Sequence, residues 1–146
     1  MTIHKYKNGY DWDGVPVLKY KEDGTHFKSI TRRVLFGGND NLPCEIRYFE
    51  IAAGGHSTLE RHEHTHTVII VRGKGEALVD SKIITCNPFD VIEIASLVWH
   101  QFRATKNETF GFFCIVNINR DKPTRPAIAD IAAIAGNQKI ASFIRT

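Results

Sequence analysis

The segment ERHEHTHTVIIVRGKG, residues 60–75, begins with a potential metal ligand at every second position: Glu60, His62, His64 and His66. In an extended chain, residues two apart point to the same side, so these side chains can converge on one point. Imidazoles together with a carboxylate suit a first-row divalent metal ion such as Mn, Fe, Ni or Zn. The apolar run VIIV that follows is expected to be core. A polar turn of solvated histidines without a metal is the alternative interpretation.

The thiols form a second group of side chains that could carry chemistry. Cys44, Cys86 and Cys114 are an odd number of cysteines with no CxxC pair among them. This argues against a disulfide framework and against a zinc knuckle. We expect three reduced thiols, each of which is either a buried core residue or a nucleophile.

The composition limits the classes of protein to consider. The 146 residues are enough for one domain with one core, and 42% hydrophobic with 24% charged residues is typical of a soluble globular chain. No apolar run approaches the roughly 18 residues of a membrane span, and the N-terminus lacks the apolar segment of a signal peptide, so we expect a cytoplasmic protein. The net charge of +3 comes from scattered Lys and Arg, which argues against nucleic-acid binding and is compatible with a small anionic ligand.

The elements that must position these residues are strands. Short runs rich in Val, Ile and Phe alternate with Gly, Asn, Asp or Pro between about residues 30 and 118, without any helical periodicity. Strands are expected over 29–36, 44–52, 65–72, 75–80, 89–95, 100–105 and 110–118. Strands spaced this closely favour an all-β sandwich or barrel of antiparallel strands.

The C-terminal tail has a different pattern. Two apolar sets at helical spacing predict two short helices that cover the outside of the barrel or a neighbouring subunit. The sets are Ile128, Ile131 and Ile134, then Ile140, Phe143 and Ile144. Pro126 suits a first helical turn, and Gly136 with Asn137 would provide the left-handed residue that ends a helix.

Two segments resemble the two sequence motifs of the cupin superfamily. They are Gly55–Gly73 and NPFDVIEIASLVWHQFRA, residues 87–104. Counted back from Gly73, the family's glutamate ligand falls on His66 and its two histidines fall on Glu60 and His62. The second motif contributes His100. The resemblance thus implies a metal site of Glu60, His62, His66 and His100, with His64 either beside it or in place of Glu60 as a ligand.

This resemblance covers about residues 45–118 and has consequences for the whole chain. It implies a double-stranded β-helix, the jelly-roll-like cupin barrel, in a single domain 1–146. In that domain, 1–43 would be an N-terminal arm with edge strands, 44–118 the barrel core and 119–146 the helical tail. The stretch 23–38 resembles the arm that cupin subunits lay against a partner's sheet, which implies a homodimer.

Metal-binding cupins include dioxygenases, isomerases, lyases and non-catalytic binders, so the fold alone does not choose a function. The string from Arg47 to Val79, with WHQFRA and GFFCIVNINRDKP, is similar to cupin methylsulfurylases that act on 1-methylthio-xylulose 5-phosphate. This similarity implies a carbon–sulfur lyase reaction at manganese, with Cys114 as the nucleophile. An Fe(II) dioxygenase and a non-catalytic metal or small-molecule binder are the alternatives. In the binder, Cys114 would be only a core residue.

A phosphate-bearing substrate would need fixed positive charges. Four arginines lie on or beside predicted strands, where they could face either the inside or the outside of a barrel, and none is singled out as a ligand. They are Arg33, Arg47, Arg72 and Arg103.

Overall fold

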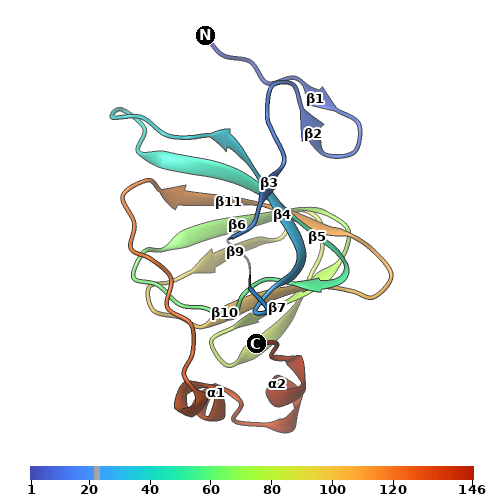
Figure 1. Ribbon diagram of the computed structural model, residues 1–146, viewed down its shortest axis with the longest axis vertical. Coiled ribbons are helices and arrows are strands. Elements are labelled where there is room, and N and C mark those ends of the chain that lie inside the picture. The colour runs from blue at the N-terminus through green and yellow to red at the C-terminus, as the bar shows by residue number, and fades with distance from the viewer. Residues whose placement is uncertain (22–23) are drawn as a thin grey trace.

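The protein is a curled antiparallel sheet with two short helices beneath it (Figure 1). A computed structural model describes residues 1–21 and 24–146. The strands are β1 (Tyr6–Lys7), β2 (Asp11–Trp12), β3 (Leu18–Lys19), β4 (Lys28–Phe36), β5 (Cys44–His56), β6 (His66–Arg72), β7 (Gly75–Val79), β8 (Lys82–Cys86), β9 (Val91–Ile94), β10 (His100–Ala104) and β11 (Phe110–Asn117). The helices are α1 (Ile128–Ile134) and α2 (Gln138–Phe143).

The main sheet has the strand order β8-β7-β10-β5-β11-β6-β9, and β4 pairs with β5 beside this path while β3 pairs with β4. The predicted all-β architecture is therefore confirmed, and the seven predicted strands are present. The strand predicted over 44–52 continues to His56 as β5, where its end pairs with Arg103 of β10. This long strand belongs to both halves of the curled sheet, so it joins the two halves of the barrel.

β8 is a strand that the sequence pattern did not predict. It pairs with β7 in a hairpin whose ends are Val79 and Lys82. Asp80 at the turn has φ of 57°, a left-handed conformation that Asp tolerates better than most residues. The sequence KIITC is short and half exposed, so its apolar alternation is weak. The short strands β1, β2 and β3 were also not predicted, because two residues carry no periodicity.

The core lies inside the curl of the sheet and follows the period of two expected for strands. On β6 the buried side chains are His66, Val68 and Ile70, and on β11 they include Phe112 and Cys114. Each large apolar side chain that is fully buried stabilises the fold by about 1.5–3 kcal/mol. The same alternation that fills the core thus directs His66 and Cys114 into the interior.

The N-terminal arm packs against the outside of its own barrel. The Tyr10 ring stacks on Tyr48 at 5.6 Å, and the Tyr10 hydroxyl donates to the Val71 carbonyl at 2.8 Å. Of the stretch 23–38 that resembles a dimerisation arm, Asp23 lies outside the described residues, and 28–36 forms β4 in the sheet of the same chain. Residues 28–36 therefore complete the sheet of the same chain.

The two predicted helices are present below the barrel (Figure 1). Ile140 and Phe143 are buried against Leu59 and Leu78, so they cover one end of the barrel, as their apolar spacing predicts. The expected left-handed helix end is wrong: Asn137 has φ of −147° and caps the start of α2, where its side chain accepts from the Ile140 amide at 3.1 Å. Asn is equally suited to this N-cap role, which its side-chain oxygen explains.

The tail is also tied to the sheet by Gln101, which is fully buried on β10. Its amide nitrogen donates to the carbonyls of Ser57 and Arg145 at 2.9 and 2.7 Å, and its oxygen accepts from the Arg145 amide at 2.9 Å. A buried amide whose donors and acceptor are all used specifies a single arrangement of the chain. The C-terminal residues are thus fixed to the barrel by side-chain hydrogen bonds as well as by apolar packing.

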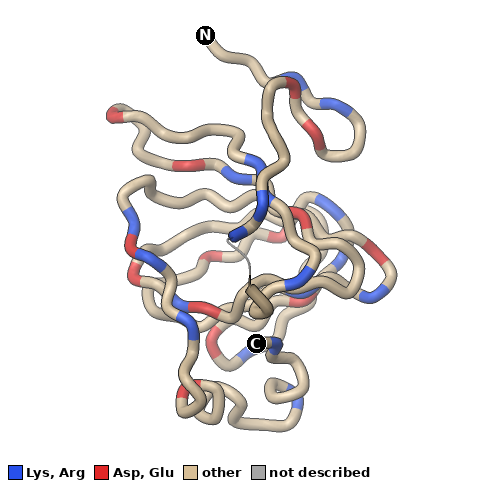
Figure 2. The backbone as a smooth tube through the Cα atoms, in the orientation of Figure 1, with Lys and Arg blue, Asp and Glu red and all other residues tan. Residues whose placement is uncertain are grey.

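Charged residues are distributed over the whole molecule (Figure 2). Lys and Arg occur in the β1–β2 hairpin, in the sheet and in the C-terminal tail, mixed with Asp and Glu. Among the described residues, no helix has the length and apolar character needed to cross a membrane.

Candidate metal and thiol site

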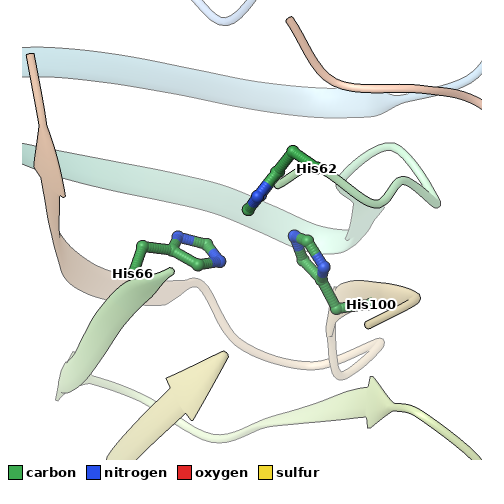
Figure 3. A group of neighbouring side chains, drawn as sticks. All are labelled: His62, His66 and His100. Carbon is green, nitrogen blue, oxygen red and sulfur yellow. The ribbon is translucent and has the colours of Figure 1, made fainter. Parts of the chain in front are cut away.

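Three of the predicted metal ligands come together inside the barrel. His62 lies in the loop after β5, His66 is the first residue of β6, and His100 is the first residue of β10. One ring nitrogen from each lies within 4.8 Å of the others, and the three rings are turned toward one another (Figure 3). Segments that are far apart in the sequence thus place three imidazoles around one point.

Backbone pairing explains how these segments meet. Glu60 and His100 form an isolated antiparallel bridge, with hydrogen bonds of 3.1 Å from the Glu60 amide and 3.0 Å from the His100 amide. The Leu97 amide donates to the His62 carbonyl at 2.7 Å, so the loop before His100 also holds the loop that carries His62. The first and second motifs are therefore joined by main-chain bonds that do not depend on their side chains.

Local hydrogen bonds fix which nitrogen of each ring faces the centre. The Nδ1 atoms of His62 and His100 lie 2.7 and 2.9 Å from the carbonyls of His64 and Val98, and a carbonyl can only accept, so each Nδ1 carries the proton. This leaves the Nε2 lone pairs free. Within the described part of the chain, His66 Nε2 is buried without a hydrogen-bond partner. An unpaired buried nitrogen costs about 1–3 kcal/mol, so the arrangement fits a bound cation.

Electrostatics keep the rings neutral. Burial, with a smaller contribution from the neighbouring histidines, lowers the pKa of His66 to about 2 and that of His62 to about 4. Burial also lowers the pKa of His100. All three are therefore unprotonated near neutral pH, which is the form that coordinates metal ions.

Glu60 lines the same cavity but does not belong to this compact set of donors. Its carboxylate forms an ion pair with Lys21, whose ammonium also donates to the Thr58 hydroxyl at 3.2 Å. Lys21 was not considered from the sequence, because it lies 39 residues away from Glu60 and nothing in its local pattern marks it.

His64 is directed toward a different partner. Its ring stacks on His62 at 3.6 Å with the planes 4° apart, and its Nδ1 lies 2.6 Å from Asp121. Asp121 also accepts from the amides of Glu63 and His64, and these bonds hold the pKa of its carboxyl below the ordinary value. Asp121 thus anchors the turn between His62 and His66, a role that the sequence alone did not reveal.

Cys114 contacts the histidine cluster. Its sulfur lies 3.1 Å from His66 Nδ1 and accepts a hydrogen bond from Arg47 Nη2 at 3.2 Å, and the residue is 2% exposed. Burial raises the pKa of the Cys114 thiol, and the Arg47 guanidinium opposes that rise. The other thiols are also free, but neither Cys44 nor Cys86 lines this cavity.

The cavity has a volume of about 220 Å³ and contains the histidines, Glu60 and Cys114 in its wall. Of the four arginines considered from the sequence, Arg47 lines it. The other three bind elsewhere: Arg33 to Asp11, Arg72 to Glu50 and Arg103 to the Phe143 carbonyl. Arg32 and Arg120 also line the cavity and were not considered from the sequence. Which side of a strand Arg32 or Arg33 faces depends on the register, and adjacent arginines give no pattern to decide it.

A curled antiparallel barrel that gathers three histidines from two motifs is the arrangement of a cupin, and the chain belongs to the cupin family. The family's cupin domain matches residues 47–116. A curated protein of Rhodospirillum rubrum named 1-methylthio-D-xylulose 5-phosphate methylsulfurylase is 47% identical over 140 residues, which are 95% of this chain and 89% of that protein.

Two crystal structures are similar over nearly the whole chain. A cupin 2 conserved barrel domain protein from Rhodopseudomonas palustris has a TM-score of 0.93 and 42% identity, covering 99% of this chain and 100% of that one. A cupin-2 domain protein from Rhodospirillum rubrum has a TM-score of 0.87 and 45% identity, covering 97% and 95%. The similarity therefore includes the N-terminal arm and the helical tail as well as the barrel.

Proposed function

We propose that this cupin is a metal-dependent enzyme that removes the methylthio group from a methylthio-sugar phosphate, as a methylsulfurylase. The observation that carries the proposal is the position of the Cys114 sulfur, which contacts the histidine cluster inside a cavity of small-molecule size. The name of the 47% identical relative supports the same substrate class. The reaction would produce deoxyxylulose 5-phosphate from 1-methylthio-xylulose 5-phosphate.

The proposed ligands of the metal are the Nε2 atoms of His62, His66 and His100. Glu60 would be the fourth ligand if its carboxylate leaves Lys21. We propose manganese as the metal, with iron, nickel or zinc as alternatives that the same donors accept. A divalent ion there would supply positive charge next to the sugar oxygens, where negative charge develops during the reaction.

The chain's own residues would perform the group transfer. The Cys114 thiolate, stabilised by the Arg47 N–H and the His66 N–H, attacks the methylthio sulfur. A sulfur–sulfur bond forms, the carbon–sulfur bond breaks, and its electron pair stays on the sugar as an enolate of the neighbouring ketone. Protonation of the carbon gives the methyl ketone of the product. Cys114 is left as a methyl disulfide, and a second thiol must attack it to release the methylthio group and restore the thiolate.

A single-turnover experiment tests this function. Metal-loaded protein is mixed with 1-methylthio-xylulose 5-phosphate in the absence of added thiol, and its intact mass is measured. We expect a mass increase equal to one methylthio group in place of hydrogen, and none in Cys114→Ser. Cys44→Ser is the matched control, because Cys44 lies outside the cavity, and it should react like the wild type.

The opposite results are equally clear. A Cys114→Ala variant that is folded, retains metal and forms deoxyxylulose 5-phosphate as fast as the wild type would exclude Cys114 as the nucleophile. A wild-type protein that binds the sugar phosphate but never converts it would instead indicate a non-catalytic binder.

A further inference from the structure

The wall of the metal and thiol cavity carries an excess of positive charge. Four basic side chains line it, namely Lys21, Arg32, Arg47 and Arg120. Against them stand Glu60, which lines the cavity, and Glu45, which pairs with Arg47 and Arg120 just outside it. With the histidines neutral, these six side chains leave two positive charges uncompensated among residues 1–21 and 24–146, so this part of the cavity wall is electrostatically suited to an anion.

Three of these four cations already have partners. Lys21 is paired with Glu60 and bonded to Thr58. Arg47 donates to the Cys114 sulfur and lies 3.1 Å from Glu45. The two terminal nitrogens of Arg120 donate to the Asn117 carbonyl at 2.9 Å and to Glu45 at 3.1 Å. These contacts hold the three side chains in place and use much of their capacity to bind a ligand.

Arg32 differs from the other three. Across residues 1–21 and 24–146, it makes one hydrogen bond, from Nε to the Lys19 carbonyl at 3.2 Å. That bond orients the side chain, and neither terminal nitrogen has a hydrogen-bond partner within the described part of the chain. The planar guanidinium fork matches two oxygens of a phosphate group, which a lysine cannot do. Arg32 is thus a cation of defined orientation in the cavity wall, and its terminal N–H groups can bind two oxygens of a ligand.

The strand register places Arg32 on the same side of the sheet as Cys114, two strands away from it. Arg32 on β4 is opposite Phe49 on β5, whereas Arg47, two residues before Phe49, is opposite Cys114 on β11. Arg32 and Arg47 are therefore diagonal neighbours on adjacent strands, about 7–8 Å apart with their Cβ atoms somewhat closer. The Arg32 guanidinium and the Cys114 sulfur face the same cavity from positions two strands apart, which allows one extended small molecule to contact both.

We propose that Arg32 is the phosphate-binding residue of this cavity and that it sets the orientation of the substrate. Its fork holds the phosphate of a sugar phosphate at the β4 side, so that the opposite end of the carbon chain lies at Cys114. The identity of the ligand as a sugar phosphate rests on the proposed function, whereas the anion site itself rests on the charge, contacts and register of Arg32. Arg32 thereby determines specificity and does not take part in the bond-breaking step.

Binding measurements on the manganese-loaded protein test the proposal. The probes are 1-deoxy-D-xylulose 5-phosphate and unphosphorylated 1-deoxy-D-xylulose, measured by isothermal titration calorimetry. In Arg32→Gln we expect the Kd of the phosphorylated sugar to rise by about tenfold or more, since charge-assisted hydrogen bonds are lost, while the Kd of the unphosphorylated sugar stays the same. Arg32→Lys keeps the charge without the fork and should fall between wild type and Arg32→Gln.

Lys28→Gln is the matched control. It removes one positive charge from the same strand at an exposed position that does not line the cavity, so both Kd values should remain at the wild-type level. Metal content and thermal midpoint are measured for every variant, and Arg32→Gln should match the wild type in both. Equal weakening by Arg32→Gln and Lys28→Gln, or an unchanged Kd in Arg32→Gln, would overturn the proposal.

The same variants separate this inference from the proposed reaction. If the wild type fails to remove a methylthio group but Arg32→Gln still selectively loses the phosphorylated sugar, the anion site stands and the reaction proposal fails. If the reaction occurs, Arg32→Gln should raise KM for the methylthio-sugar phosphate by about tenfold or more with little change in kcat. A fall in kcat at unchanged KM would show that Arg32 does not hold the phosphate.

Discussion

The two nitrogens of His66 connect the metal cluster to the thiol. Nδ1 lies 3.1 Å from the Cys114 sulfur, and the buried Nε2 faces the other two histidines. A single imidazole is thus in contact with both parts of the site. A change at the metal cluster should therefore affect the Cys114 thiol through the His66 ring, and a change at the thiol should affect the cluster in the same way.

The first prediction concerns the metal ligands. His62→Ala, His66→Ala and His100→Ala should each reduce the metal content of the purified protein from nearly stoichiometric to a small fraction, because each removes one of three converging nitrogens. His64→Ala should largely keep the metal, since its ring is held by Asp121. Elemental analysis of the four variants and the wild type measures this. Loss of metal in His64→Ala with retention in His62→Ala would mean that the assigned register is wrong.

The second prediction concerns pH. The pKa of His62 is about 4 in the folded chain and 6.5 when unperturbed, so between these values the unfolded chain binds a proton that the folded chain does not. The contribution of the neutral His62 ring to stability is thus fully present above pH 6.5 and is lost as the pH falls toward 4. His66 and His100 act in the same direction because burial lowers their pKa values too.

Thermal unfolding of chelator-treated protein from pH 7 to pH 4 measures this loss as a falling midpoint. His62→Gln removes one titrating ring, so its midpoint should fall less steeply with pH over the same range. A wild-type midpoint that does not change between pH 6.5 and pH 4 would contradict the neutral, buried cluster.

At the scale of single residues, the sequence predicted the three histidines of the cluster, and also Glu60, which lies outside that compact set, but it did not predict their partners. The spacing of His62 and His66 before an apolar strand, together with His100, was sufficient because strand parity and the cupin motifs constrain both. Lys21, Asp121 and Arg32 were missed. Lys21 contacts Glu60, 39 residues away, and Asp121 contacts His64, 57 residues away. The role of Arg32 depends on which face of β4 its side chain occupies. None of these features produces a local sequence pattern.

At the scale of the elements, the turn between β6 and β7 depends on Gly73. Its φ is 62°, and a Cβ atom added there would collide with the Thr109 carbonyl of the neighbouring loop. Gly54 provides a matched comparison, because its φ is 72° and nothing lies within 4 Å of an added Cβ. Both positions have a left-handed backbone, Gly54 within β5 and Gly73 in a turn, and they differ in the space available to an added Cβ atom.

The third prediction follows from this pair. Gly54→Ala should lower the free energy of unfolding by about 1–2 kcal/mol from its left-handed backbone alone, and Gly73→Ala should lower it by about 1–3 kcal/mol more because the turn must move away from Thr109. Urea denaturation of both variants and the wild type measures the difference. Equal losses would show that the Thr109 loop yields without cost, and that only the backbone conformation matters at Gly73.

The strand pattern predicted elements better than it predicted their ends. Runs such as 65–72 and 110–118 are apolar on one face, so their existence was evident from the period of two. β8 was missed because KIITC is a half-exposed strand with little contrast between its faces. Asn137 was assigned to the wrong helix end because the same residue type caps both ends of helices, and only the distance to the next helix decides.

At the scale of the whole molecule, the C-terminal helices belong to the folding unit. Phe143 and Ile140 close one end of the barrel, and Gln101 bonds the main chain of Arg145 from inside the sheet. The sequence predicted that both helices cover the barrel or a neighbouring subunit. α2 buries its apolar side chains against the barrel, whereas α1 has no buried residue and its Ile128 is 88% exposed. The sequence did not reveal the hydrogen bonds between Gln101 and the main chain of Arg145, because a lone glutamine in a strand gives no sign of a partner 44 residues away.

The fourth prediction tests this closure. Phe143→Ala should lower the free energy of unfolding of the whole protein by about 3–5 kcal/mol, since it empties a buried position shared with Leu59 and Leu78. Ile128→Ala is the control on α1: the residue is 88% exposed, and the change should be within about 0.5 kcal/mol of the wild type. Both are measured by urea denaturation with a fluorescence signal. If Phe143→Ala were as stable as Ile128→Ala, the packing of the C-terminal tail would not contribute to the stability of the barrel.

The burial of Cys114 in the wall of a single cavity has a consequence for the kinetics of the proposed reaction. Cys114 is 2% exposed, so the sugar phosphate and the resolving thiol would have to approach its sulfur through the same cavity. The resolving thiol can therefore reach Cys114 only after the first product has left. Initial rates at varied concentrations of both substrates should then give parallel lines in a double-reciprocal plot, the pattern of a ping-pong mechanism.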